Sequence, residues 1–91
     1  MNYSEIIKDV LSVITEAGND QGISIEGVYD EAAKKYIVTE KGTVHDESFY
    51  NVVVAMKVEN EKIIIEHNLT DIDFREKFVE SGIKYENIVY A

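Results

Sequence analysis

The 91-residue chain has no cysteine, no proline and no tryptophan, and only 9 basic residues against 18 acidic ones. Without cysteine it can form neither disulfide bonds nor thiolate metal sites, and it has no thiol nucleophile. The formal net charge of −9 argues against a phosphate-binding surface, because non-specific nucleic-acid affinity comes from Lys and Arg that neutralise phosphates. The same charge argues against docking on an anionic membrane. We therefore expect neither direct nucleic-acid binding nor membrane association.

Long hydrophobic runs are also missing. The longest apolar run is Val52–Met56, whereas a membrane-spanning helix needs about 20 apolar residues. The N-terminus carries no basic segment followed by an apolar stretch, so no signal peptide is predicted, and we expect a cytoplasmic protein. Hydrophobic residues make up 45% of the chain, too many for a disordered acidic tail. This length fits a single domain spanning residues 1–91.

The apolar spacing predicts a helix near each end of the chain. Between Tyr3 and Ala17 apolar residues recur every three or four positions, which places them on one helix face. Asn2 and Glu5 have the spacing of a capping box, and Gly18 can end the helix.

The second helix is expected to begin after Thr70, which has the side chain of an N-cap. Leu69 and Phe74 have the spacing of a hydrophobic staple across that cap. Gly82 can end this helix, with Ile83 folding back in a Schellman-type turn.

Alternating apolar and polar residues predict four strands between these helices. The predicted strands cover residues 23–29, 35–39, 49–58 and 62–67. Residues 40–47 are expected to form a polar loop, and residues 88–90 either a short final strand or a packed tail. In the strand 49–58, one face is expected to hold Tyr50, Val52, Val54, Met56 and Val58. This order predicts an α+β fold with a four-stranded antiparallel meander between two helices.

Motifs for catalysis, cofactors or metals are missing from the sequence. His67 has no second ligand at metal-site spacing, and His45-Asp46-Glu47 reads as a solvated acidic turn. There is no phosphate-binding glycine loop and no nucleophile motif. We expect no catalytic residues, no cofactor and no metal, and therefore not an enzyme.

Three stretches carry a family resemblance: a strand and hairpin followed by a Thr-led helix in residues 53–71, a helix ending in Gly in 78–83, and Glu-Asn-Ile-Val in 86–89. Together with Tyr3-Ser4-Glu5-Ile6-Ile7 they resemble the XisI family, the fdxN element excision controlling factors of cyanobacteria. Where that family usually has Asp-Gly in the hairpin, this chain has Asn60-Glu61. The resemblance implies an accessory role in programmed DNA excision, beside a partner of the XisH family, which resembles restriction-endonuclease-like nucleases.

The acidity favours binding to a basic protein partner, and the doubly apolar strand 49–58 favours a homo-oligomer as well. Tyrosine is frequent at protein contacts, so the candidate interface residues are Tyr29, Tyr36, Phe49 and Tyr50. Two alternatives stay open. One is an antitoxin-like, immunity-type or DNA-mimicking inhibitor of a nuclease. The other is a small-ligand-binding module, which would need a pocket between the first helix and the sheet.

Overall fold

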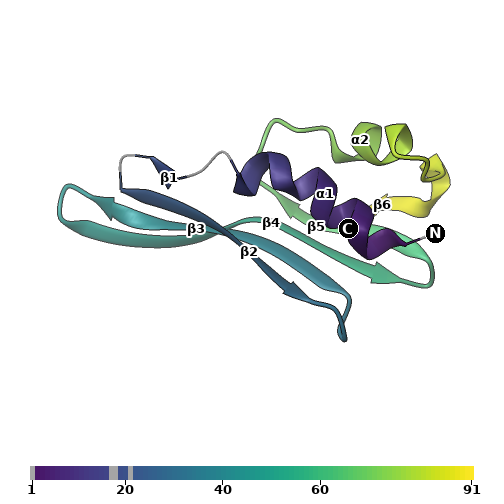
Figure 1. Cartoon of the computed structure of the whole chain (residues 1–91), viewed down its shortest axis with the longest axis horizontal. Coiled ribbons are helices and arrows are strands. Elements are labelled where there is room, and N and C mark those ends of the chain that lie inside the picture. The colour runs from purple at the N-terminus through teal and green to yellow at the C-terminus, as the bar shows by residue number, and fades with distance from the viewer. Residues whose placement is uncertain (1, 17–18, 21) are drawn as a thin grey trace.

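The computed structural model describes residues 2–16, 19–20 and 22–91 (Figure 1). The elements are α1 (Tyr3–Thr15), β1 (Asn19–Asp20), β2 (Ile23–Asp30), β3 (Lys35–Val44), β4 (Glu47–Glu59), β5 (Lys62–Asn68), α2 (Phe74–Glu80), the 3-10 turn η1 (Tyr85–Asn87) and β6 (Ile88–Tyr90). They form one six-stranded sheet in the order β1-β2-β3-β4-β5-β6. Only β5 and β6 pair in parallel. The α+β fold, the two helices and the meander β2–β5 are confirmed, and the C-terminal residues form a strand.

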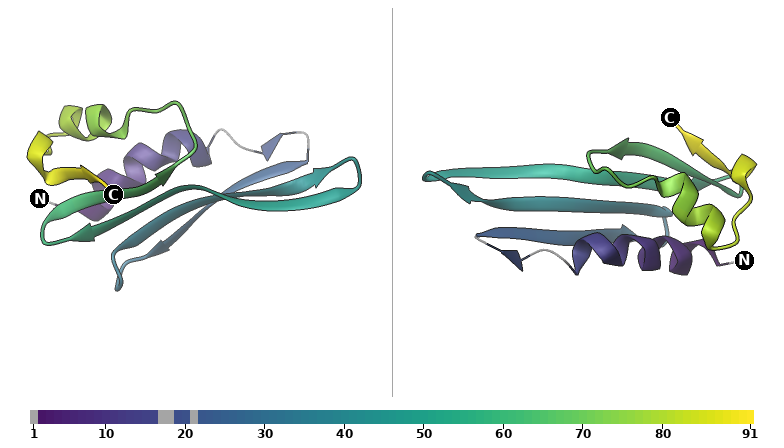
Figure 2. Two further views of the ribbon diagram at one scale, coloured as in Figure 1. Left: turned by 180° about the vertical axis from the view of Figure 1, so that it is seen from behind. Right: turned by 90° about the horizontal axis from the view of Figure 1, so that it is seen from above.

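Both helices lie on the same face of the sheet (Figures 1 and 2). They cover one half of it, while the far part of the β3–β4 hairpin extends beyond them, which gives the molecule a long axis of 44 Å. Neither helix described here has the length and hydrophobicity to span a membrane. The protein thus has a helix-covered half and an uncovered hairpin arm.

The core lies between the helices and the covered half of the sheet. Ile7 and Leu11 of α1, and Phe74 and Phe78 of α2, are fully buried. The other buried apolar residues are Tyr36, Val38, Val53, Val54, Met56, Ile63, Ile65, Ile83 and Ile88. Burial of such side chains contributes about 1.5–3 kcal/mol each, which makes this face of the sheet the main source of stability.

The cap of α1 forms as predicted, because the Asn2 side chain accepts a hydrogen bond from the Glu5 backbone N–H at 3.2 Å. Glu16 is the C-cap residue. The helix-ending role predicted for Gly18 falls outside the described residues.

The start of α2 differs from the prediction, since its N-cap is Asp73, whose side chain accepts from the Glu76 N–H at 3.1 Å. Thr70 instead lies in the preceding turn, where its hydroxyl donates to Asn68 Oδ1 at 2.6 Å and accepts from the Ile72 N–H at 3.1 Å. A Thr competes well for such local turns. Leu69 is 63% exposed, so the predicted staple with Phe74 is wrong.

The end of α2 is the predicted Schellman turn. The Ile83 N–H donates to the Phe78 carbonyl, and the Gly82 N–H donates to the Val79 carbonyl, both at 3.0 Å. Gly82 has a φ of 98°, which glycine adopts without the steric cost that a Cβ brings.

The predicted polar loop over residues 40–47 is wrong, because β3 continues to Val44 and β4 begins at Glu47. Only His45 and Asp46 form the turn, with φ values of 52° and 63°. Asn60 and Glu61 make the second two-residue turn, with φ of 53° and 62°. Positive φ at both central residues is the type I′ geometry that matches strand twist in hairpins.

A β-bulge in β4 overturns the predicted assignment of its faces. Val38 pairs with Val54 but Thr39 pairs with Val52, which leaves Val53 as the extra residue. Val53 and Val54 are therefore both buried, while Val52 is 38% exposed. Because a bulge shifts the side-chain alternation by one residue, Val52 and Tyr50 do not share the buried face with Val54.

Candidate protein-interaction surface

Four aromatic residues were expected at an interface. For Tyr36 this prediction is wrong, because its side chain is only 2% exposed and belongs to the core. Its ring packs against Tyr29 with centroids 5.9 Å apart. Its hydroxyl donates to Glu31 Oε2 at 3.3 Å. A buried tyrosine needs such a partner for its hydroxyl, so Tyr36 serves the fold.

The remaining three aromatic residues do not form one surface. Tyr29 is half-buried, and its ring lies over Gly27, where a Cβ would lie 2.5 Å from the Tyr29 hydroxyl. Burial raises the pKa of Tyr29. Phe49 is half-buried against Gly42 on the hairpin arm. Tyr50, in the same arm, is 65% exposed, so it alone is freely accessible.

Sequence reasoning missed an aromatic cluster around Arg75, the only arginine. Its guanidinium carbon lies 4.6 Å from the ring centroid of Tyr85 and 4.9 Å from that of Tyr90. Nη1 donates to the Tyr85 hydroxyl at 3.2 Å, and Nη2 donates to the Ile88 carbonyl at 2.9 Å. Arg75 thus ties α2 to η1 and β6. The only sequence signal was two tyrosines close to the predicted final strand.

This cluster lies in a shallow depression of about 480 Å³ that combines acidic and apolar side chains. We call it the Arg75 patch; its residues are Asp73, Arg75, Glu76, Val79, Glu80, Tyr85 and Tyr90. Tyr85 is 64% exposed and Tyr90 45%. Arg75 Nε is buried with no hydrogen-bond acceptor among the described residues, which costs about 1–3 kcal/mol. Exposed tyrosines beside a fixed arginine have the composition of an interface hot spot.

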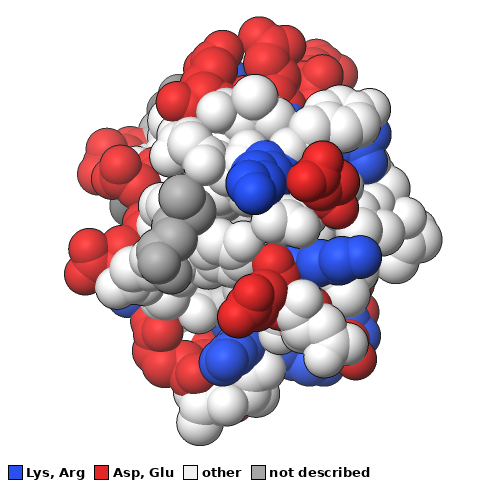
Figure 3. All heavy atoms as spheres, turned by 90° about the vertical axis from the view of Figure 1, so that its right-hand side faces the viewer, with Lys and Arg blue, Asp and Glu red and all other residues white. Residues whose placement is uncertain are grey.

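The helical segments carry a surplus of negative charge. The acidic residues on or beside the helices are Glu5, Asp9, Glu16, Asp71, Asp73, Glu76 and Glu80, whereas the basic ones there are Lys8, Arg75 and Lys77. Figure 3 shows acidic side chains gathered over α2, and basic and acidic side chains mixed below them. On the sheet, Lys57 Nζ forms ion pairs with Glu59 Oε2 at 3.3 Å and with Glu66 Oε2 at 3.9 Å. The helical side therefore offers an acidic surface to a basic partner.

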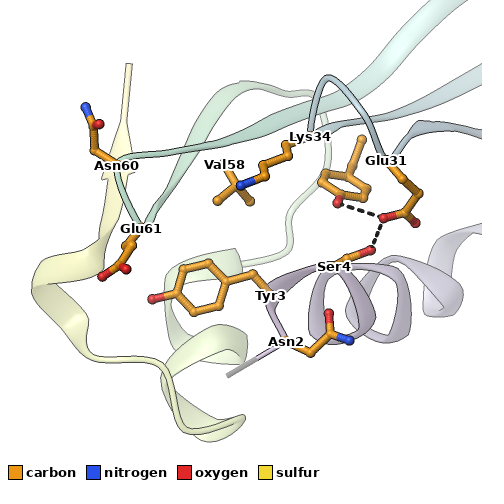
Figure 4. A pocket seen from close by; sticks show the side chains of 9 residues that line it. Asn2, Tyr3, Ser4, Glu31, Lys34, Val58, Asn60 and Glu61 are labelled. Carbon is orange, nitrogen blue, oxygen red and sulfur yellow. Dashed lines mark hydrogen bonds between the residues drawn. The ribbon is translucent and has the colours of Figure 1, made fainter.

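A pocket of about 540 Å³ lies between the start of α1 and two sheet turns (Figure 4). Asn2, Tyr3 and Ser4 line it from α1, Glu31 and Lys34 from the β2–β3 loop, and Asn60 and Glu61 from the β4–β5 turn. A small-ligand-binding module would need a pocket between the first helix and the sheet, and this pocket lies there.

The carboxylate of Glu31 is held by three donors. Lys8 Nζ lies 2.7 Å from Oε1, and the Ser4 hydroxyl donates to Oε2 at 2.5 Å. The third donor is the Tyr36 hydroxyl. The hydrogen bond from Lys8, followed by the one from Ser4, lowers the pKa of Glu31, and Glu31 in turn raises the pKa of Lys8. A carboxylate stabilised in its charged form is a poor general base, so this network is structural.

The two histidines show no catalytic or metal-binding arrangement. His67 Nε2 donates to the Val52 carbonyl at 3.0 Å, across the β4–β5 pair. His45 lies in the turn at the tip of the β3–β4 hairpin. Among the residues the structure describes, His, Asp and Glu form no group that could hold a metal ion.

Comparison with known proteins identifies the family. A family model described as XisI protein matches residues 1–91. The chain belongs to the XisI family. It is similar to the crystal structure of a XisI-like protein from Anabaena variabilis ATCC 29413, with a TM-score of 0.87 and 26% identity, covering 96% of this chain and 81% of that one.

A second XisI structure, the fdxN element excision controlling factor XisI from the same organism, matches with a TM-score of 0.81 and 18% identity. The match covers 96% of this chain and 86% of the other. At that identity, the likeness shows the shared XisI fold alone. The search of curated proteins found no match.

Proposed function

We propose that this chain is a cytoplasmic, non-catalytic accessory factor of programmed DNA excision, and that it acts by binding a nuclease-like partner of the XisH type. Membership of the XisI family supports the role in excision. The observation that carries the binding mechanism is the net charge of −9, with carboxylates in surplus over basic residues on and beside the helices.

The electrostatics explain how such a factor would control a nuclease. A nuclease binds DNA through basic side chains that neutralise phosphates. An acidic protein surface is attracted to the same basic side chains, and complementary charge speeds the encounter. Occupying that surface, or part of it, limits the partner's access to DNA without any chemistry in this chain.

Self-association is a further part of the proposal. The helices leave one sheet face uncovered, and Val28, Ile37 and Ala55 form a row of direct cross-strand neighbours there. Because Lys57, Glu59 and Glu66 are also paired on the sheet, a second copy would meet a mixed-charge, self-complementary surface, as a two-fold dimer requires. Sedimentation equilibrium tests this: Ile37→Lys should shift a dimer to monomer, and a monomeric parent protein would refute it.

Co-purification tests the partner proposal. The tagged chain is co-expressed with a XisH-type protein and captured at low and high salt, with lysozyme added as an unrelated basic protein. We expect the XisH-type protein to be retained, more at low salt than at high salt, and lysozyme to be washed away. Loss of the partner at low salt, together with binding to duplex DNA at physiological salt, would overturn the proposal. If the partner is toxic alone and this chain relieves the toxicity, the chain is an antitoxin-like inhibitor.

A small-ligand-binding module is the second candidate, and the 540 Å³ pocket at the start of α1 favours it. Nuclear magnetic resonance screening with small polar metabolites would show shifts at residues 2–4 and 60–61 if the pocket binds one of them. Shifts confined to other residues would rule this candidate out.

A further inference from the structure

We infer that the Arg75 patch is the docking site for the protein partner, and that the contacting segment of the partner is basic. Its Arg or Lys side chains lie against the exposed ring faces of Tyr85 and Tyr90, with their charges paired to Glu76 and Glu80. The inference rests on the proposed function, since it locates the surface through which partner binding occurs.

The patch is pre-formed, which favours binding. Two hydrogen bonds and two cation–π contacts fix Arg75 and hold Tyr85 and Tyr90 against it. Side chains that are already ordered lose little entropy when a partner arrives. Tyrosine and arginine in a depression are also the residue types that dominate binding energy at protein interfaces.

Charge decides the chemistry of the occupant. Asp73, Glu76 and Glu80 outnumber the single guanidinium of Arg75, and that guanidinium is already engaged. An acidic segment would meet repulsion, and a second copy of this patch would bring the same surplus of carboxylates. A basic segment finds both carboxylates and the ring faces that attract cations.

The contact is made by side chains and not by strand addition. β6 is an edge strand, and an edge can recruit a partner strand through its free backbone groups. However, the Ile88 carbonyl of β6 already accepts the hydrogen bond from Arg75 Nη2. Because Arg75 covers that position, the patch offers rings and carboxylates to a partner, but not a complete strand edge.

Calorimetry with the XisH-type protein tests the site. The double variant Glu76→Gln/Glu80→Gln should weaken binding about tenfold and flatten its salt dependence, and Tyr85→Ala should weaken binding by at least about tenfold. The matched control Glu26→Gln/Glu47→Gln removes the same charge from exposed sheet positions and should leave the affinity within about twofold. Tyr85→Phe keeps the ring and serves if Tyr85→Ala fails to fold; it should stay within about threefold of the parent protein.

A second measurement separates failure of the site from failure of the proposed function. The ¹⁵N-labelled chain is titrated with a synthetic peptide of arginine and leucine, without the XisH-type protein. The largest amide shifts should fall in residues 73–80 and 85–90. Shifts concentrated elsewhere, absent shifts, or patch variants that bind the XisH-type protein as tightly as the control would overturn the inference. If the parent chain does not bind the XisH-type protein, the proposed function fails, whatever the peptide map shows.

Discussion

Replacing Glu61 by glycine is expected to stabilise the protein. Glu61 is the second central residue of the β4–β5 hairpin turn and has a φ of 62°. Its side chain is exposed and takes part in no hydrogen bond or ion pair found among the described residues. The substitution therefore changes the backbone preference of the turn and little else in the folded state.

The size of the effect follows from two opposing terms. A residue with a Cβ destabilises the folded state by about 1–2 kcal/mol in the left-handed region. Glycine loses about 0.5–1 kcal/mol more chain entropy on folding, which opposes the gain. The net gain is about 0.5–1 kcal/mol. For a domain of this size, that corresponds to a rise in Tm of about 2–8 °C.

Urea denaturation and a thermal scan measure this gain. Glu61→Gln is the control for charge, because it removes the carboxylate but keeps the Cβ, and it should change stability by less than about 0.5 kcal/mol. Glu47→Gly places the same glycine substitution in a strand, and it should destabilise by about 0.5–1 kcal/mol. A Glu61→Gly protein that is no more stable than the Glu61→Gln protein would refute the type I′ geometry of this turn.

Three further changes probe the core, the Glu31 network and the hairpin arm. Val54→Asp and Ile63→Asp, both at fully buried positions, should unfold the protein in circular dichroism, since an unpaired buried carboxylate costs several kcal/mol of a total of about 5–15. Native spectra would show that the core is misplaced. Glu31→Gln should lower stability at neutral pH, and the difference from the parent protein should vanish as the pH falls below 4.5, because the folded state holds the pKa of Glu31 below that ordinary value. A pH-independent difference in denaturation would contradict the Glu31 network. Gly42→Ala should cost about 1–3 kcal/mol in urea denaturation, because the new Cβ would lie 2.6 Å from the Gly22 carbonyl oxygen; unchanged stability would contradict this close approach.

The sequence was sufficient for the order of the two helices and of strands β2–β5, but not for β1 or η1, because periodicity and capping depend on neighbouring residues. The Asn2 cap and the Gly82 Schellman turn were predicted from side chains within a few positions of each other. The cap of α2 was misplaced because Thr70 and Asp73 are both good caps. Tertiary contacts decide between them, and these place Thr70 in a turn with Asn68.

Features that depend on pairing between distant strands could not be predicted. The bulge at Val53 is defined only by the register between β3 and β4, and it moves Val52 and Tyr50 off the buried face. The polar composition of residues 40–47 indicated a loop, but cross-strand pairing extends both strands to a two-residue turn. Local propensity in such strands is readily overridden by pairing and packing.

The candidate site shows the same limit. Tyr36 looked accessible because a strand tyrosine with unknown register can face either side, and it proved to be buried. The Arg75 patch joins residues from α2 with Tyr85 and Tyr90. In the sequence Arg75 is a lone arginine among acidic residues, and the return of the chain along β5 that brings Tyr90 to it is not visible there.

The central claim is that surplus negative charge directs this protein to a protein partner and not to DNA. Fluorescence anisotropy at physiological salt compares the labelled chain mixed with the XisH-type protein and mixed with a DNA duplex. We expect saturable binding to the XisH-type protein, weakening as salt rises, and no binding to the duplex. Binding to the duplex without binding to the XisH-type protein would contradict the claim.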